Sequence, residues 1–242
     1  YLTHHELVDS IHITGSARTH DVIVFGPSEK GQKRKRENQP INTKPISSEL
    51  GGVSPTIVVP GPWSKGDFKF QAEHIATQKL QNSGHNCIAT QVLIMPEDWT
   101  GTERLLQEVE NEIANAEKRP AYYPGSEDRQ NAAREHANAK FLDSEVDRTI
   151  IYDVDSQIDE PCFSDEYFSP VLATVSIPGD NPSAFIQAAV QFVNEKLDGT
   201  LGANIIIDPK TARENKADLD QAIADLKYGS IGVNTWCALA FL

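Results

Sequence analysis

Short apolar runs alternate with amphipathic stretches through the middle of the chain. Residues 56–59 form a β-branched run that ends at Pro60-Gly61-Pro62, and residues 90–95 form a second apolar run. Both are typical of buried strands. Residues 72–80 between them have helical spacing, so the pattern predicts strand, helix and strand in succession.

The same alternation continues toward the C-terminus. Thr102 is expected to cap a helix with one apolar face, and Asn181 and Pro182 are expected to open another. The inward side chains are Leu105, Leu106, Val109 and Ile113 in the first helix and Phe185, Ile186, Ala189, Phe192 and Val193 in the second. A strand at 204–207, a helix at 216–228 and a strand at 232–234 follow. This order predicts an α/β fold, a largely parallel sheet flanked by helices.

Three other stretches have no such alternation. Residues 11–14 and 22–25 are both β-rich and flank a polar turn at 15–20. Residues 33–36 read Lys-Arg-Lys-Arg and are interpreted as a solvated loop, with a nuclear-localisation patch or a contact to a cofactor phosphate as alternatives. The polar residues 122–138 predict a surface insertion with an exposed helix.

Composition narrows the possible functions. The formal net charge is -13, which disfavours binding to nucleic acid, and no apolar run approaches the roughly 18 residues of a membrane span. We therefore expect neither nucleic acid nor a membrane as a partner. Cys87, Cys162 and Cys237 lie far apart without any C-x-x-C pair, so no disulfide framework or zinc site is predicted and a cytoplasmic location is expected.

Cys87 and Glu49 are the candidate chemical groups. Cys87 ends the run Asn-Ser-Gly-His-Asn-Cys, where Gly84 and polar neighbours can expose a thiol, although a lone cysteine is more often a small buried hydrophobe. Glu49 directly precedes Leu-Gly-Gly, where a close backbone turn can hold a carboxylate beside a site. By itself it could equally be an ordinary surface glutamate.

Histidines offer two alternatives. His85, two residues before Cys87, suggests a Cys-His hydrolase, but no third member of a triad stands out. His4-His5-Glu6 resembles a metal motif only superficially, because the second histidine of H-E-x-x-H would fall at Val8. No metal site is predicted.

Several segments in order resemble the aldehyde dehydrogenase superfamily. The matching segments are T-G-S at 14–16, E-L-G-G-V-S-P at 49–55, N-S-G-H-N-C at 82–87, F-S-D-E-Y-F-S-P-V at 163–171, L-G-A-N-I-I-I-D-P-K at 201–210 and Y-G-S-I-G-V-N-T-W at 228–236. The resemblance covers residues 9–242. It departs from the family pattern at His20 and Ser169, where the family usually has glycine.

The resemblance implies NAD(P)-dependent oxidation of an aldehyde to a carboxylic acid. Cys87 would be the nucleophile that forms a thiohemiacetal and then a thioester, and Glu49 would activate the water that hydrolyses the thioester. The implied contacts to NAD or NADP are Gly15, Ser16, Leu50, Glu166 and Phe168, with Glu166 on the nicotinamide ribose and Phe168 near the ring. The partner implied is a small-molecule aldehyde, which these motifs do not identify.

The resemblance also implies the domain organisation. Residues 1–49 would be the trailing part of a Rossmann-like cofactor-binding domain, and residues 50–242 would be a catalytic domain truncated at its C-terminal end. The family's oxyanion-hole asparagine and coenzyme-binding lysine are then expected before Tyr1, so the chain is expected to be an inactive fragment of a homo-oligomeric parent. The alternatives are a non-catalytic structural fragment of this fold and a relative that transfers its acyl group to coenzyme A.

Overall fold

The computed structural model describes residues 2–143 and 145–242, and the chain divides into two compact units. Unit 1 is Tyr1–Gly51 and unit 2 is Gly52–Leu242. The division falls two residues after the boundary expected at residue 49. The assignment of these units to cofactor binding and to catalysis remains a prediction. No helix in the described residues is long and apolar enough to cross a membrane.

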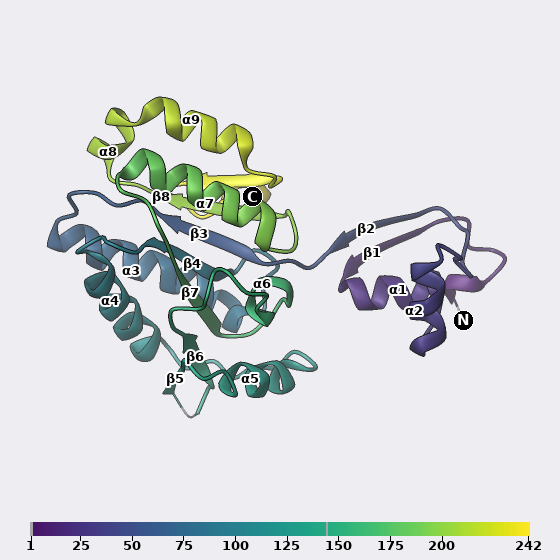
Figure 1. Cartoon of the computed structure of the whole chain (residues 1–242). Coiled ribbons are helices and arrows are strands. Elements are labelled where there is room, and N and C mark those ends of the chain that lie inside the picture. The colour runs from purple at the N-terminus through teal and green to yellow at the C-terminus, as the bar shows by residue number, and fades with distance from the viewer. Residues whose placement is uncertain (1, 144) are drawn as a thin grey trace. The chain divides into compact units, whose positions relative to one another are not determined.

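Unit 1 is built on a pair of parallel strands. Its elements are the 3-10 helix η1 (Leu2–His4), β1 (Ile11–Gly15), α1 (Ala17–Phe25), α2 (Ser28–Arg36) and β2 (Ile46–Leu50). Since parallel neighbours need a crossover, the two helices provide the connection between β1 and β2 (Figure 1).

Two predictions in unit 1 are wrong. Residues 22–25, expected as a β-rich run, form the last turns of α1, because the Ser16 side chain caps this helix by accepting a hydrogen bond from the Thr19 amide. The basic residues 33–36, expected as a loop, form the end of α2. Arg34 donates to the Phe25 carbonyl and Lys35 pairs with Asp21, so these cations are tied to α1.

Unit 2 contains a seven-stranded sheet with the order β5-β6-β7-β4-β3-β8-β9. The strands are β3 (Ser54–Val58), β4 (Thr90–Pro96), β5 (Ala139–Asp143), β6 (Arg148–Ile151), β7 (Val171–Ile177), β8 (Gly202–Ile206) and β9 (Ser230–Val233). Every neighbouring pair is parallel except β5 and β6. The predicted α/β fold with a largely parallel sheet is confirmed.

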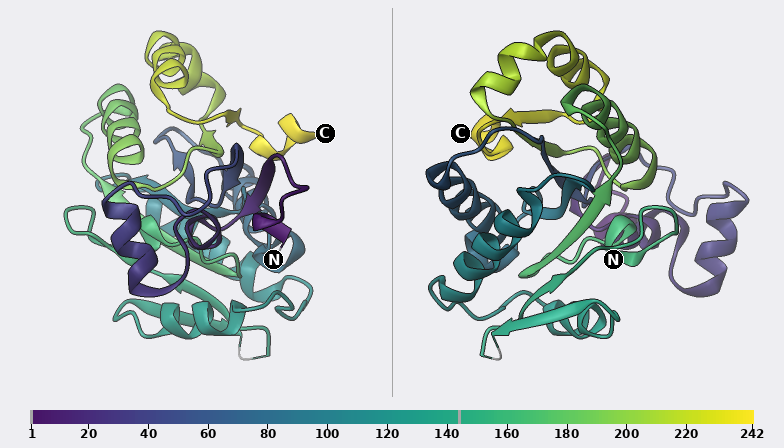
Figure 2. Two further views of the ribbon diagram at one scale, coloured as in Figure 1. Left: turned by 90° about the vertical axis from the view of Figure 1, so that its right-hand side faces the viewer. Right: turned by 60° about the vertical axis from the view of Figure 1, so that its left-hand side comes forward.

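Helices cover both faces of this sheet (Figure 2). They are α3 (Lys65–Leu80), α4 (Thr102–Asn115), α5 (Ser126–Arg134), α6 (Pro161–Ser164), α7 (Pro182–Lys196), α8 (Pro209–Glu214) and α9 (Lys216–Asp225), with 3-10 turns η2 (Gln81–Gly84) and η3 (Cys237–Phe241). Successive residues of β3 face opposite layers: Ile57 packs in the cluster with α7 and α9, and Val58 packs in the cluster with α3 and α4.

The hydrophobic pattern predicted most of these elements. The expected strands overlap β3, β4, β8 and β9 and the expected helices overlap α3, α4, α7 and α9, although α3 begins seven residues before its predicted start and α9 ends three residues before its predicted end. Thr102 is the first residue of α4, and the N-cap is Gly101. The Thr102 hydroxyl donates to the Pro96 carbonyl. The helix α5 is not fully exposed, because Gln130 and Ala133 are buried.

Strand order brings three loops to one edge of the sheet. Because β3, β4 and β7 are parallel and adjacent in the order β7-β4-β3, their amino ends lie at the same edge. The segments that enter these strands are residues 52–53, 81–89 and 165–170. The last two carry the predicted site residues of unit 2.

Candidate active site

The loop that carries Cys87 has an unusual backbone. After α3, three successive residues have positive φ: Asn82 at 54°, Ser83 at 56° and Gly84 at 75°. A turn follows in which the Ala89 amide donates to the Asn86 carbonyl at 3.1 Å. The Asn86 side chain also accepts from the Ile88 amide at 3.0 Å. This turn leaves Cys87 exposed just before β4 begins.

Gly84 is required for this loop to lie where it does. A Cβ atom at Gly84 would be 2.4 Å from the Ser169 carbonyl oxygen, which is far inside van der Waals contact. The glycine therefore allows the loop to pack directly on the backbone of the segment 166–170. This close approach gives a packing reason for the glycine of the N-x-G-x-x-C motif.

The three cysteines differ in exposure. Cys87 is exposed, whereas Cys162 and Cys237 are buried. Burial raises the pKa of the Cys162 thiol to about 12 and that of the Cys237 thiol to about 11. Since the thiolate is the reactive species, neither buried thiol suits a nucleophile near neutral pH.

Glu166 and Phe168 lie on the segment against which the Cys87 loop packs. Burial raises the pKa of the Glu166 carboxyl to about 7, although the charges of Arg129 and Lys79 lower it. Phe168 has a positive φ of 44°, and its ring lies edge-on to that of His85 at 5.7 Å between centroids. The structure thus brings the predicted nucleophile's loop and both predicted nicotinamide contacts to one edge of unit 2.

Two cations of this region were not foreseen from the sequence. Lys79 is 1% exposed and donates to the carbonyls of Ser169 at 3.2 Å and Val171 at 2.8 Å. Burial lowers the pKa of Lys79 to about 7, opposed by the charge of Glu166. Arg129 donates to the Tyr167 carbonyl at 2.5 Å. Helical spacing held a signal for Lys79, which lies seven residues after Ala72 and therefore on the apolar face of α3.

His85 holds the loop in place. Its Nδ1 is 3.0 Å from the Asn82 carbonyl oxygen, its Nε2 is 2.8 Å from the Ser126 hydroxyl, and its ring packs on that of Tyr122 in a tilted arrangement, with 4.7 Å between centroids. Burial lowers the pKa of the His85 ring. Both ring nitrogens have structural partners other than the Cys87 thiol, so the contacts do not favour a Cys-His hydrolase.

The other predicted residues gather in unit 1. In the register of the parallel pair, Thr14 lies opposite Glu49 and Gly15 lies opposite Leu50, and Ser16 follows β1 as the cap of α1. Glu49 is exposed. A Cβ at Gly15 would meet nothing within 4 Å, so the space over the end of β1 is open.

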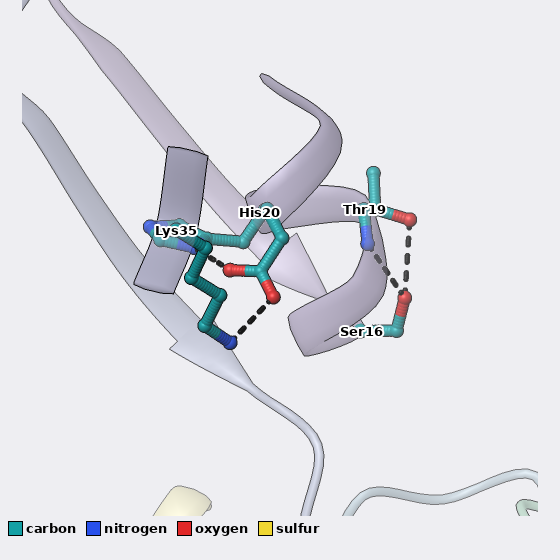
Figure 3. A network of polar contacts seen from close by, with 5 residues as sticks. Ser16, Thr19, His20 and Lys35 are labelled. Atoms are coloured by element: carbon teal, nitrogen blue, oxygen red, sulfur yellow. Dashed lines mark hydrogen bonds and ion pairs between the residues drawn. The ribbon is translucent and has the colours of Figure 1, made fainter. Parts of the chain in front are cut away.

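His20, which replaces the family glycine, belongs to a small polar network on α1 (Figure 3). Its Nδ1 is 3.3 Å from one oxygen of Asp21, and the Lys35 ammonium is 2.6 Å from the other. Burial raises the pKa of Asp21, but hydrogen bonds from Lys35 and His20 lower it further than burial raises it. Histidine at this position is thus accommodated by pairing with a neighbour on its own helix.

The predicted site residues therefore form two groups, one in each unit. Glu49, Gly15, Ser16 and Leu50 belong to unit 1, and Cys87, Glu166 and Phe168 belong to unit 2. A site shared by Glu49 and Cys87 stays a prediction. Within residues 2–143 and 145–242, no three His, Cys, Asp or Glu side chains are grouped as a bound metal ion would require.

Comparison with known proteins agrees with this fold. The model of the aldehyde dehydrogenase family matches residues 1–121, half of the sequence. The chain belongs to the aldehyde dehydrogenase family. A comparison with curated proteins finds no significant match.

Solved structures of this family share the fold. The chain is similar to an NADP-dependent glyceraldehyde-3-phosphate dehydrogenase from Bacillus halodurans complexed with NADP, with a TM-score of 0.71 and 20% identity over 97% of this chain and 46% of that one. It is also similar to the aldehyde dehydrogenase KauB from Pseudomonas aeruginosa, with a TM-score of 0.68, 21% identity and coverages of 97% and 46%. A gamma-glutamyl-gamma-aminobutyraldehyde dehydrogenase from Burkholderia cenocepacia is similar with a TM-score of 0.68 and 22% identity, over 97% of this chain and 46% of that one. The chain thus spans less than half the length of each of these structures.

Proposed function

We propose that the protein takes part in NAD(P)-dependent oxidation of an aldehyde to a carboxylic acid, with Cys87 as nucleophile and Glu49 as general base. The observation that carries the proposal is the exposed Cys87 on a loop that Gly84 allows to pack on the segment of Glu166 and Phe168. An accessible thiol on a loop that packs against the segment of a carboxyl and an aromatic ring suits attack on a carbonyl held at this edge.

Residues in each unit suit one part of a nicotinamide dinucleotide. Gly15 leaves open space above the end of β1, and Ser16 begins a helix whose first amides favour an anionic group. Glu166 can hold a ribose hydroxyl and Phe168 can pack beside a planar ring. Related structures hold NADP in one case and NAD+ in another. When bound, the dinucleotide would supply the acceptor for the hydride, and so for the two electrons, that leaves the substrate carbon.

Cys87 would perform the first step. Its thiolate adds to the aldehyde carbon, a C–S bond forms, and the carbonyl oxygen becomes an oxyanion, to which the backbone N–H of Cys87 would donate. A preorganised donor of this kind stabilises the charge that develops at the oxygen. After oxidation the acyl group remains on sulfur as a thioester.

Glu49 would perform the last step. Its carboxylate takes a proton from water, the resulting hydroxide attacks the thioester carbon, and Cys87 leaves as a thiolate. The exposure of Glu49 and its place in the E-L-G-G segment support this role, because a general base must be accessible to water.

Two rival functions are separable by experiment. A coenzyme A-dependent relative would release an acyl thioester in place of the acid, so analysis of the product distinguishes it; Glu49 favours water as the acceptor. A purely structural role would leave the protein unable to bind either nucleotide, and titration with NAD and NADP distinguishes that case.

The test is an assay of NADH and NADPH formation across several aldehydes, with this 242-residue chain and with a longer protein that contains it. We expect higher turnover by the longer protein, because the 242-residue chain spans less than half the length of the related structures and hydride transfer needs every group that orients nucleotide and substrate. In the longer protein, Cys87→Ser should lower turnover by about a thousandfold or more. Glu49→Gln should still give one equivalent of reduced nucleotide and then stall. Full turnover by Cys87→Ser would contradict the proposal.

A further inference from the structure

We propose that Lys79 is a positioning residue that fastens the segment 166–171 to the helix that leads into the Cys87 loop. Lys79 lies in the last turn of α3, directly before η2. Its side chain is wholly buried, and its ammonium donates to the carbonyls of Ser169 and Val171. One side chain therefore links the two segments that carry Cys87 and Phe168.

The two acceptors are arranged for a single donor group. The Val171 amide donates to the Ser169 carbonyl at 2.7 Å, a tight turn at the entrance to β7. The Ser169 carbonyl is also the atom that a Cβ at Gly84 would approach to 2.4 Å. The Lys79 ammonium and the Gly84 backbone thus meet the same peptide group of the segment. Removal of the ammonium would leave two buried carbonyls without this donor.

Stability by itself does not explain a lysine here. A buried ammonium is costly to desolvate, and an apolar side chain of similar volume would fill the same space in α3 without that cost. What an apolar side chain cannot do is donate to two carbonyls at once. A lysine is therefore suited to fixing the position of the turn that follows Phe168.

The link does not depend on the protonation state of Lys79. A charged ammonium has three N–H donors and a neutral amine still has two, enough for the two carbonyls. Between pH 6 and 8, where the pKa of about 7 places the titration, the segment should stay fastened. Lys79 is therefore expected to hold the segment throughout this pH interval and not to act as a pH-dependent switch.

The functional consequence rests on the proposed function, because it concerns the position of Glu166 and Phe168 relative to the loop that carries Cys87. The role of Lys79 in holding the segment can be tested without any enzymatic activity. This role and the proposed function can therefore fail separately. Hydrogen exchange followed by mass spectrometry reads the backbone of each segment directly.

The experiment compares Lys79→Met with Lys69→Met, a control on an exposed lysine of the same helix. In Lys79→Met we expect amide exchange in 81–89 and 166–171 to accelerate about tenfold or more, while peptides of α7 stay within about twofold of the parent. Lys69→Met should leave all of these unchanged. Lys79→Gln, which keeps N–H donors on a shorter side chain, should fall between Lys79→Met and the parent.

Three results would overturn the proposal. Unchanged exchange in both segments would show that the two hydrogen bonds do not hold them. Equal acceleration in α7 would show a general loss of stability and not a local role. If Lys79→Met does not fold, Lys79→Gln is judged by the same criteria, and failure of both variants to fold would make Lys79 a residue needed for folding.

Discussion

The parallel strands of the two units differ sharply in burial. In unit 2, every residue of β3 and β4 is buried, because helices cover both faces of the sheet. In the described part of unit 1, β1 and β2 contain no buried residue. The buried hydrophobic side chain of that part is Val24, which lies in α1. Parallel sheets are normally covered on both faces. The pair in unit 1 thus has the hydrogen bonding of such a sheet without its core.

This difference separates two ways of holding functional residues. In unit 2 the residues around Cys87 are fixed by buried contacts, including the close approach at Gly84 and the donors on Lys79. In unit 1, Gly15, Ser16 and Glu49 are exposed and are fixed mainly by strand register and one helix cap. We therefore expect unit 2 to resist local opening and unit 1 to open at lower cost.

The largest expected effect is on the core of unit 2. Phe185 is fully buried, so Phe185→Ala should lower the free energy of unfolding of unit 2 by about 3–5 kcal/mol. Val24→Ala, which removes two carbons, should cost roughly 1.5–2 kcal/mol and act on unit 1. Urea unfolding followed by tryptophan fluorescence measures the difference, because Trp63, Trp99 and Trp236 all lie in unit 2. An equal shift of that transition by Val24→Ala would show that the units unfold together.

A smaller effect is expected from the two site glycines. Gly84→Ala forces a Cβ against the Ser169 carbonyl at a positive φ, so it should destabilise unit 2 by about 2–3 kcal/mol and displace the Cys87 loop. Gly15→Ala adds a methyl group to open space and should change the stability of unit 1 by less than about 0.5 kcal/mol. Denaturation of the first variant and hydrogen exchange in unit 1 of the second test this contrast. Tolerance of alanine at Gly84 would remove the packing argument.

Glu166 should give unit 2 a pH dependence of modest size. Its folded pKa of about 7 lies above the ordinary 4.5, so its contribution to stability is present below pH 4.5 and is lost as the pH rises toward 7. Glu166→Gln removes this loss, and its stability relative to the parent should rise by about 1–2 kcal/mol between pH 4.5 and 6.5. Urea unfolding at several pH values measures it, with Glu49→Gln as the same substitution at an exposed site. A constant difference over this interval would show that burial does not raise the pKa of the Glu166 carboxyl.

Hydrophobic spacing predicted the helices and strands that have one clear apolar face. It succeeded for α3, α4 and α7, where inward residues recur every three or four positions. It failed at residues 22–25, because Val-Ile-Val suits a strand as well as a helix and the cap at Ser16 decides between them. The strands β5 and β6 were not predicted, since they are short and pair with each other across a turn.

The sequence predicted only those candidate site residues that lie within a recognisable motif. Cys87, Glu166 and Phe168 were predicted from family segments and stay predictions as site residues, and the structure places the last two on the segment that packs on the Cys87 loop. Lys79 could not be assigned a role, because its acceptors lie 90 and 92 residues away and are backbone carbonyls, which leave no mark on the sequence. The contact between Gly84 and Ser169 likewise depends on strand order and not on local pattern.

The central claim is that Cys87 is the thiol that attacks an aldehyde, and its alkylation in the presence of aldehyde tests this most directly. With limiting iodoacetamide and peptide mapping, we expect Cys87 to be labelled at least about tenfold faster than Cys162 or Cys237, because it is exposed and the pKa values of the other two are raised. Increasing aldehyde concentration should slow the labelling of Cys87 in a saturable way, since addition to the carbonyl consumes the thiolate. Faster labelling of Cys162 or Cys237, or no protection of Cys87 by any aldehyde, would contradict the account.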